Sequence, residues 1–313
     1  MTPDTRYAPH ALPGQLDIVQ GPGGLPVIEI RNRFATARIS VHGAHVLSFR
    51  PKDDADLLFL SEQAVFQPGK AIRGGVPVCW PWFGPDPQGQ GRPAHGFVRT
   101  RLWDLRRTET LAGGETLVEL GLRDSTETRA IWPHGFDLSL TVIVGRSLFL
   151  ALTTRNTGDS PFELTQALHS YFAVADIAQV RVTGLDGCAY VDKAKGAGGV
   201  RKVQAGDVAV DAEVDRVYAG VPDVLTIEDG AAARRVRLTA GGSRTAVVWN
   251  PWAEVAAGMA DLPDDAYRRF VCVETANAGE EVLTLAPGDS RTLAVDIAPP
   301  RSTASRVATP HGG

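Results

Sequence analysis

The stretch DLSLTVIVGRSLFLALTTRN, residues 137–156, gives the clearest indication of the fold, because hydrophobic and polar residues alternate along most of it. This alternation is typical of a β-strand with one buried and one exposed face, and it lacks the spacing of a helix. The same pattern recurs in VIEIR (27–31), ATARISV (35–41), HVLSF (45–49), TLVELGL (116–122), VRVTG (180–184), DVLTIED (223–229), RRVRLTA (234–240), TAVVWN (245–250), RFVCVET (269–275) and RTLAVDI (291–297). We therefore predict strands along nearly the whole chain.

Turn-forming sequences such as NTGD and APGD separate these segments. Many antiparallel strands joined by turns are typical of a sandwich in which two sheets cover one another. We predict an all-β fold of large antiparallel sheets with little helix. The chain has 313 residues, 43% of them hydrophobic, which fits one large domain, and we place it at residues 15–298. Residues 1–14 and 299–313, rich in Pro, Ser, Thr and Gly, are expected to be flexible tails.

The composition restricts the partners. A formal charge of -4 gives no broad positive surface, which argues against nucleic acid and confines any anion site to a local cluster. The N-terminal sequence lacks the basic and apolar regions of a signal peptide, and no hydrophobic run is long enough to span a membrane. Cys79, Cys188 and Cys272 lie far apart and form no CxxC pair. We expect a soluble cytoplasmic protein with reduced thiols, and, without heptads or long apolar edges, a monomer.

The segment IRGGVPVCWPWFGPDPQGQGRPAHGFVR, residues 72–99, predicts a polar site on a stiff scaffold. Its prolines at 77, 81 and 85 remove backbone donors and fix φ, so it cannot be helix interior or central strand. Four large aromatic residues are expected to pin the loop against a sheet: Trp80, Trp82, Phe83 and Phe97. Arg73 and Arg99 would then be available to bind an anion, although two arginines alone are a weak signal.

Two further residues are candidates for acid/base chemistry. His169 lies in the apolar segment QALHSYFAVADI, where a hydrogen-bonded structural histidine is the plainer interpretation. Its neighbour Ser170 does not indicate a serine hydrolase, because the chain contains no GxSxG motif. Glu274 interrupts the apolar run FVCVE, and strand alternation places it on the same face as Cys272. A carboxylate there is either part of a structural salt bridge or a base held in a cleft.

Other polar residues remain ambiguous from the sequence alone. Asp215 precedes a strand-like segment and is either a turn residue or an acceptor for hydroxyl groups. His95, before Gly96, either binds a ligand or caps the loop, and we include it among the candidate substrate-binding residues. The nearby His42 and His45 have no third ligand, so we expect no metal site. The segment KAKGAGGVRK, residues 193–202, lacks the order of a phosphate-binding loop and is interpreted as a mobile surface loop.

Several motifs, taken in their order, resemble the aldose epimerase superfamily, specifically its hexose-6-phosphate mutarotase branch. The resemblance covers residues 25–297, nearly the full chain, and rests on IRGGVPVCWPWFGP, HGFVR, LHSYF, EVDRVY, VVWNPW with the downstream GMAD, and VCVET. It implies a galactose-mutarotase-like β-supersandwich with a sugar cleft on the concave face of one sheet. It also implies an isomerase that acts on a sugar phosphate such as glucose 6-phosphate.

The resemblance further implies roles for five residues. The histidine of the HSYF-like motif, here His169, is the general acid, and the glutamate of the CVE-like motif, here Glu274, is the general base. Arg73, Arg99 and Asp215 match positions that bind substrate. Two departures from the family pattern are TAN at 275–277, where many relatives have a Pro-Gly or similar turn with a histidine, and alanine at 94, where some have glutamine. Both concern fine sugar contacts more than the reaction type.

The chemistry of anomer exchange agrees with these residue types. Interconverting α and β anomers requires a base that removes the anomeric hydroxyl proton and an acid that protonates the ring oxygen, so that the ring opens to an aldehyde. Glu274 and His169 would supply these two functions, and Asp215 would hold sugar hydroxyls in place. Arg73 and Arg99 would bind the phosphate, although either arginine could instead contact ring hydroxyls. The reaction needs no metal or nucleotide cofactor.

Three other functions fit part of the pattern. The first is an aldose 1-epimerase for unphosphorylated sugars such as galactose, which the two arginines disfavour. The second is a noncatalytic sugar-binding or sugar-phosphate-binding protein, since β-sandwiches often bind sugars without transforming them. The presence of both His169 and Glu274 disfavours it. The third is a glycoside hydrolase or lyase that uses Glu274 and Asp215 as a carboxylate pair.

Overall fold

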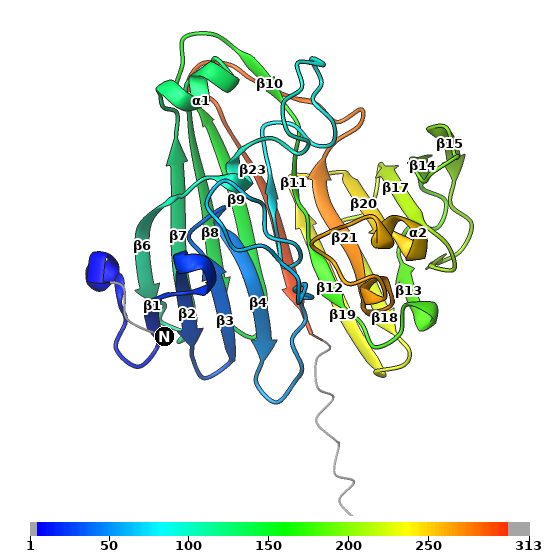
Figure 1. The fold of residues 1–313 in the computed structure, drawn as a ribbon, viewed down its shortest axis with the longest axis horizontal. Coiled ribbons are helices and arrows are strands. Elements are labelled where there is room, and N and C mark those ends of the chain that lie inside the picture. Colours follow the sequence, from blue (N-terminus) through cyan, green and yellow to red (C-terminus); the bar gives the residue numbers. More distant parts are fainter. Residues whose placement is uncertain (1–4, 300–313) are drawn as a thin grey trace, which may run out of the picture.

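Residues 5–299 are described by the structure, a computed structural model, and they form mainly β-strands joined by loops and short helices (Figure 1). The predicted all-β class and scarcity of helix are confirmed. The helices are α1 (Thr126–Ile131), α2 (Trp252–Ala257) and the 3-10 helices η1 (Thr5–His10), η2 (Pro22–Gly24), η3 (Val98–Thr100), η4 (Ile177–Gln179) and η5 (Ala266–Arg269). Within this described range, no helix has the length and hydrophobicity needed to cross a membrane.

The largest sheet has nine antiparallel strands and contains the segment 137–156 near its middle. In spatial order its strands are β16 (Val208–Ala209), β13 (Val180–Thr183), β18 (Val224–Asp229), β19 (Arg234–Gly241), β23 (Ser290–Ala298), β9 (Leu148–Asn156), β8 (Phe136–Val144), β7 (Thr116–Arg123) and β6 (Asp104–Thr110). Every second residue of β8 is buried, which is the alternation that its sequence predicts. One face of this sheet therefore packs into the core.

A second sheet of eight strands carries the residues expected to be functional. Its strands are β15 (Val200–Val203), β14 (Ala189–Asp192), β17 (Val214–Ala219), β20 (Thr245–Asn250), β21 (Phe270–Asn277), β11 (Gln166–Leu168) and β5 (Val78–Cys79), with β12 (Tyr171–Ala173) also paired to β21. All residues of β21 are buried. Val271 and Val273 lie in the main core, whereas Cys272 packs in a separate cluster on the other face. Glu274 shares the face of Cys272, as alternation along the strand predicts.

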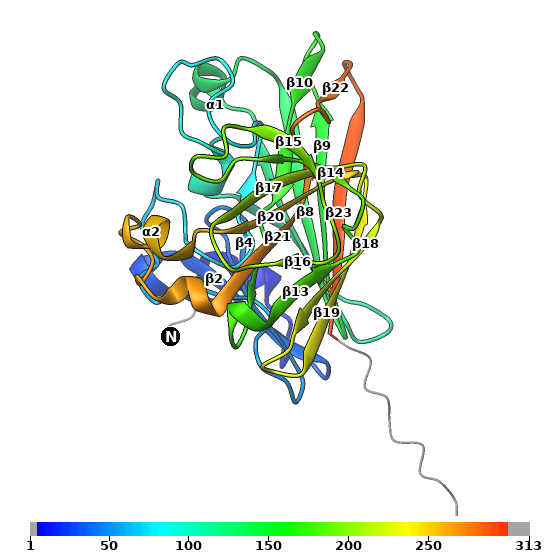
Figure 2. The same cartoon turned by 90° about the vertical axis from the view of Figure 1, so that its right-hand side faces the viewer.

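A third sheet and a small ribbon complete the fold. They consist of β1 (Leu16–Gln20), β2 (Pro26–Arg31), β3 (Ala35–Ser40) and β4 (His45–Pro51), and of β10 (Phe162–Leu164) paired with β22 (Leu283–Leu285). Figures 1 and 2 show the four-stranded and eight-stranded sheets side by side, both facing the nine-stranded sheet. Ile39, Leu140 and Val273, one from each sheet, belong to a single core cluster. The sandwich therefore leaves the outer face of the eight-stranded sheet outside the core.

The loop of residues 72–99 is pinned by its aromatic side chains, as its sequence predicts. Trp80, Trp82 and Phe97 are almost completely buried. The Trp80 Nε1 donates a hydrogen bond to Thr154 Oγ1 of β9 at 2.9 Å, which ties the loop to the largest sheet. Within the loop only β5 is a strand, and it lies at the end of the eight-stranded sheet. The loop is thus rigidly placed beside the outer face of that sheet.

Two segments expected to be loose have more structure than their composition suggested. Of the expected tail 1–14, residues Thr5–His10 form η1, and the His10 carbonyl accepts a hydrogen bond from Thr108 Oγ1 of β6 at 2.7 Å. The segment 193–202 ends in the exposed edge strand β15, which pairs with β14. The first contact joins residues 98 positions apart, which local composition does not relate, whereas the second joins two consecutive strands. Of the expected tails, residues 1–4 and 300–313 lie outside the described residues.

Candidate active site

His169 and Glu274 meet on the outer face of the eight-stranded sheet. His169 lies in the short link between β11 and β12, and both strands pair with β21. Because β11 pairs with the residues after Glu274 and β12 with the residues before it, the link lies opposite Glu274 itself. The His169 Nε2 is 3.3 Å from Glu274 Oε1. Strand pairing thus brings together two side chains that are far apart in the sequence.

The pair is buried and incompletely hydrogen-bonded. The side chain of His169 is 10% exposed and that of Glu274 is 1% exposed. Within residues 5–299, neither His169 Nδ1 nor Glu274 Oε2 has a hydrogen-bond partner. Buried polar atoms are nearly always paired in folded proteins, so two unpaired atoms on neighbouring side chains require an explanation. A site that is completed by a ligand is one such explanation.

Burial shifts the proton affinities of the two groups in opposite directions. It lowers the pKa of His169 well below 6.5, and the nearby His95, Arg99 and Arg73 lower it further. It raises the pKa of Glu274 well above 4.5, reinforced by a neighbouring carboxylate. The pair therefore resists both gaining a second proton and losing its last one. A single shared proton can lie on either partner, because imidazolium with carboxylate and imidazole with carboxylic acid have the same total charge.

Asp215 lies on the same face of the sheet as this pair. It is opposite Trp249 in the pairing of β17 with β20, and Trp249 is opposite Cys272 in the pairing of β20 with β21. Cys272 and Glu274 are two positions apart on one strand and so face the same side. Burial raises the pKa of Asp215, while Lys193 acts against this shift. Asp215 therefore lies in strand β17, on the same face as the pair, and is not a turn residue.

His95 is held in a constrained backbone conformation at the edge of the site. Its φ is 63°, and the next residue, Gly96, has φ 72°. A Cβ on Gly96 would lie only 1.8 Å from the Trp80 carbonyl oxygen, so glycine is required there. Burial lowers the pKa of His95 to about 3, with help from nearby cations, so the ring is neutral at pH 7. Gly84 N–H donates to its Nδ1 at 3.4 Å, which leaves Nε2 as the protonated donor.

Arg73 is joined to the site through Asp261 and Tyr171. Its Nε donates to Asp261 Oδ1 at 3.1 Å, and its Nη1 donates to the Tyr171 hydroxyl at 3.0 Å. The Tyr171 ring stacks on the His169 ring, with centroids 5.0 Å apart and planes 13° apart. These contacts connect Arg73 to the histidine. The sequence did not single out Tyr171 or Asp261 individually, although both lie in motifs that resemble the family pattern.

Two more cations lie near the pair of His169 and Glu274. Arg99 donates to the Ala94 carbonyl oxygen at 2.9 Å, and its charge lowers the pKa of Glu274 against the larger opposing effect of burial. Lys193 acts on Glu274 in the same sense. Its backbone N–H donates to the Asp215 carbonyl oxygen at 2.7 Å, which anchors it where β14 ends beside β17. Sequence reasoning missed Lys193, because only strand pairing places it next to Asp215.

His42 and His45 form hydrogen bonds with backbone carbonyl groups. Their Nε2 atoms donate to the carbonyl oxygens of Lys70 at 2.8 Å and Gly74 at 2.6 Å. No three His, Cys, Asp or Glu side chains within residues 5–299 are grouped to hold a metal ion. Gly75 packs so closely that a Cβ there would lie 2.2 Å from the Val46 carbonyl oxygen. His45 and this close packing therefore support the backbone that follows Arg73.

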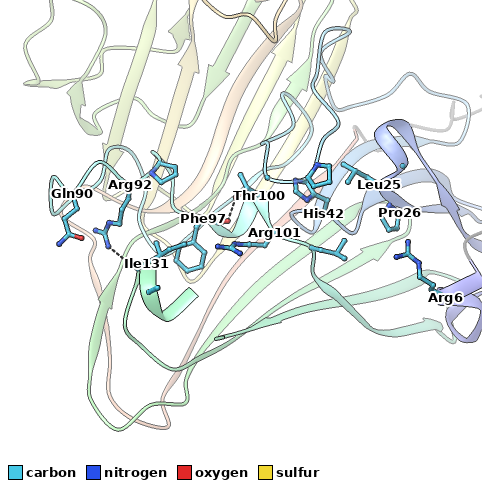
Figure 3. Close-up of a pocket in the computed structure, with 16 residues that line it drawn as sticks. Arg6, Leu25, Pro26, His42, Gln90, Arg92, Phe97, Thr100, Arg101 and Ile131 are labelled. Carbon is cyan, nitrogen blue, oxygen red and sulfur yellow. Dashed lines mark hydrogen bonds between the residues drawn. The ribbon is translucent and has the colours of Figure 1, made fainter. Parts of the chain in front are cut away.

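A separate cavity of about 830 Å³ lies away from the acid/base pair, between the loop of residues 90–102 and the N-terminal region (Figure 3). None of the predicted site residues lines it. Two of its arginines are engaged within the protein, since Arg101 pairs with Glu127 at 2.6 Å and Arg92 pairs with Asp86 at 2.5 Å. The cavity is therefore distinct from the site built around His169 and Glu274.

Solved structures of known proteins share this architecture. The crystal structure of a "putative mutarotase" from Salmonella typhimurium matches 93% of this chain and 95% of its own, with a TM-score of 0.86 and 34% sequence identity. A galactose mutarotase-like protein from Lactobacillus casei matches 87% of this chain and 99% of its own, with a TM-score of 0.69 and 17% identity. The predicted galactose-mutarotase-like fold is thereby confirmed.

Sequence comparison identifies the family. A protein of Escherichia coli K12 named "Putative glucose-6-phosphate 1-epimerase" is 41% identical over 256 residues, which are 82% of this chain and 84% of that protein. A protein of Cenchrus ciliaris with the same name is 39% identical over 283 residues, which are 87% of this chain and 84% of that protein. The family model for aldose 1-epimerase matches residues 26–298. The chain therefore belongs to the aldose 1-epimerase family.

Proposed function

We propose that this enzyme interconverts the α and β anomers of glucose 6-phosphate and similar aldohexose 6-phosphates. The observation that carries the proposal is the buried contact of 3.3 Å between His169 Nε2 and Glu274 Oε1, with cationic side chains around it. The names of the related proteins from Escherichia coli and Cenchrus ciliaris support the choice of substrate. Sugar isomerisation requires an acid and a base, and phosphate recognition requires nearby positive charge.

The spacing of the pair suits the reaction. The anomeric oxygen and the ring oxygen are bonded to the same carbon, so an acid and a base that act on them must lie side by side. Glu274 as carboxylate takes the proton of the anomeric hydroxyl, the bond between carbon one and the ring oxygen breaks, and His169 as imidazolium protonates that oxygen. The open aldehyde rotates about the bond between carbons one and two. The reverse transfers then close the ring on the other face.

Proton balance follows from the shared proton of the pair. Ring opening moves one proton from the sugar to Glu274 and one from His169 to the sugar, and ring closure returns both. The pair therefore ends each cycle as it began. Burial favours the state in which His169 and Glu274 together hold one proton, and both ring opening and ring closure depend on that state.

The other site residues would bind and orient the sugar. Asp215 would accept hydrogen bonds from hydroxyl groups, and the neutral His95 would donate one from Nε2. Arg73, Arg99 and Lys193 all lie close enough to His95 to lower its pKa, after the larger effect of burial. A phosphate placed among these three cations would be recognised by charge-assisted hydrogen bonds. This local cluster would allow an anionic substrate to bind to a chain with a net charge of -4.

The proposal is tested by measuring exchange between α and β glucose 6-phosphate at equilibrium with NMR exchange spectroscopy. Glucose and galactose serve as unphosphorylated comparisons. We expect the protein to accelerate exchange of the phosphorylated sugar most. A preference for glucose or galactose would favour an aldose 1-epimerase for free sugars. Failure to accelerate any of the three would overturn the enzyme proposal and leave a sugar-phosphate-binding protein as the better explanation.

Replacing Arg73 and Arg99 together by Met should raise KM for glucose 6-phosphate by at least about 100-fold, because two charge-assisted hydrogen bonds of about 1.5–3 kcal/mol each would be lost. The KM for glucose, which has no phosphate, should change much less. Steady-state kinetics with both sugars provides the measurement. Arg235→Met is a matched control, since Arg235 is 69% exposed and pairs with Glu228 outside the site. Equal effects on both sugars would remove the phosphate-site assignment.

The dependence of kcat/KM on pH should show a broad plateau. Burial lowers the pKa of His169, so activity should be lost on the acid side only below pH 6.5, where the pair gains a second proton. Burial also raises the pKa of Glu274, so the alkaline loss should occur well above pH 4.5, where the pair loses its last proton. The carboxylate of Asp215 reinforces that rise, so Asp215→Asn should move the alkaline limb to lower pH.

The profile should be recorded with glucose as well as glucose 6-phosphate, because the phosphate group itself titrates near pH 6. An acid limb at or above pH 6.5 with glucose would contradict the prediction.

We also propose that the enzyme acts in the cytoplasm as a monomer, with residues 15–298 as one domain. Free thiols at all three cysteines and a single main core shared by the three large sheets support this. Light scattering of the purified protein should give the mass of one chain, and a dimer mass would contradict the monomer.

A further inference from the structure

The guanidinium of Arg73 is fixed by two partners that the mechanism does not use. Its Nε donates to Asp261 Oδ1 at 3.1 Å, and its Nη1 donates to the Tyr171 hydroxyl at 3.0 Å. The side chains of Arg73 and Asp261 are 27% and 23% exposed, so the contact is largely shielded from solvent. A guanidinium has five N–H donors, and these two bonds leave those of Nη2 and one of Nη1 for a ligand.

Asp261 belongs to a ring of hydrogen bonds that also includes Ser61 and Arg73. Its backbone carbonyl oxygen accepts a bond from Ser61 Oγ at 2.7 Å. The Ser61 N–H in turn donates to the Arg73 carbonyl oxygen at 3.1 Å. Ser61 is buried, with 4% exposure. The three residues therefore hold one another through both backbone and side chain, although Arg73 and Asp261 are 188 positions apart in the sequence.

We infer that Asp261 is a positioning residue, which turns Arg73 so that its remaining N–H groups face the substrate phosphate. This inference rests on the proposed function. A carboxylate next to a phosphate site weakens the attraction of that site for a dianion, so its charge alone does not serve binding. Its benefit is orientation, since an arginine already held in its bound geometry loses less conformational freedom when phosphate binds.

Orientation and charge are separated by two substitutions. Asp261→Ala removes the acceptor of the Arg73 Nε, whereas Asp261→Asn keeps an acceptor oxygen and removes only the charge. We expect Asp261→Ala to raise KM for glucose 6-phosphate about tenfold. This corresponds to the loss of one charge-assisted hydrogen bond between Arg73 and the substrate phosphate. Its kcat for that sugar, and its KM for glucose, should stay within about twofold of wild type. Asp261→Asn should restore KM to within about threefold of wild type, or lower it.

Inorganic phosphate provides a second readout. With glucose as substrate, its inhibition constant should rise about tenfold in Asp261→Ala and should return towards the wild-type value in Asp261→Asn. Asp265→Ala is the matched control, because Asp265 lies nearby in the sequence, is 70% exposed and pairs with Arg269. It should leave all constants unchanged. If Asp261→Ala fails to fold, Ser61→Ala removes the Oγ bond to the Asp261 backbone, together with the bond that Oγ accepts from the Gln63 N–H, and should raise KM for glucose 6-phosphate in the same direction.

The inference and the proposed function fail in different ways. A wild-type protein that exchanges neither glucose 6-phosphate nor glucose removes the proposed function. With an active wild type, three results for Asp261→Ala would each overturn the positioning role. These are an unchanged or lower KM for glucose 6-phosphate, an equal rise in KM for both sugars, and a fall in kcat at constant KM. The last would show that Asp261 acts on His169 through Tyr171 and not on phosphate binding.

Discussion

Replacing Glu274 by Gln should reduce kcat for anomer exchange of glucose 6-phosphate about a thousandfold, within the range attributed to a general base. The amide matches the carboxylate in size and can still contact His169, so the buried site keeps its shape. It cannot accept the anomeric proton. The KM should change little, because the residues proposed to bind phosphate and sugar hydroxyls are intact.

NMR exchange spectroscopy measures this rate directly. Glu228→Gln is the matched control, since Glu228 also lies in a strand, β18, but pairs with Arg235 at the surface. It should leave the rate unchanged. Retention of more than about a tenth of wild-type kcat in Glu274→Gln would show that Glu274 is not the base.

The same variant should be at least as stable as wild type at neutral pH. Burial raises the pKa of Glu274 above its value in the unfolded chain, so the native state binds that proton more tightly. Stability contributed in this way is present below the unfolded pKa and is lost as pH rises through the folded pKa. Glutamine has no proton to lose. The thermal midpoint of the variant minus that of wild type should therefore increase as the pH is raised from acid to neutral. A site that has lost activity but gained stability would indicate that Glu274 is retained for function.

The strand pattern predicted the fold well, because alternation reports directly which face of a strand is buried. In the RFVCVET segment it places Val271 and Val273 in the core and Glu274 on the opposite face of the sheet, as the structure shows. The loop of residues 72–99 was also predictable, since its prolines exclude helix interior and central strand, and its tryptophans require burial. The packing of η1 was not predictable, because it depends on contacts with β6, about one hundred positions away.

The pair of His169 and Glu274 shows why single residues are ambiguous in a sequence. Taken alone, His169 was best explained as a hydrogen-bonded structural histidine, and Glu274 fitted a salt bridge equally well. Both plain explanations hold in the structure, because each residue is the partner of the other. Their unpaired second atoms, Nδ1 and Oε2, are what distinguish the site from an ordinary ion pair. No sequence pattern reports an unpaired atom, so only the family resemblance selected these residues beforehand.

Lys193 and Asp261 could not be predicted individually from the sequence, for a physical reason. Lys193 reaches the site through pairing of β14 with β17, and Asp261 reaches Arg73 through a loop that follows α2. Both contacts depend on long-range assembly, which local composition does not determine. The same assembly explains how a chain with a net charge of -4 collects Arg73, Arg99 and Lys193 around one histidine. Net charge describes the whole surface, whereas substrate recognition depends on the few charges that the fold brings together.

Replacing His169 by Gln should lower kcat for glucose 6-phosphate by a factor of about a hundred to a thousand, with little change in KM. The glutamine Nε2 can reach the position of the histidine Nε2 and keep a hydrogen bond to Glu274 Oε1, now 3.3 Å away. An amide cannot deliver a proton to the ring oxygen, so water must do so. Steady-state kinetics and NMR exchange both measure the loss.

The pH profile of this variant identifies His169 as the acid more strictly than the loss of rate. In the wild type, rate depends on a pair that holds one proton and should fall at both extremes of pH. Without the imidazole, the residual rate depends only on Glu274 being ionised, so it should rise with pH through the raised pKa of that carboxyl and then stay level. A surviving alkaline fall in His169→Gln would mean that another group, such as the Tyr171 hydroxyl beside the histidine ring, donates the proton.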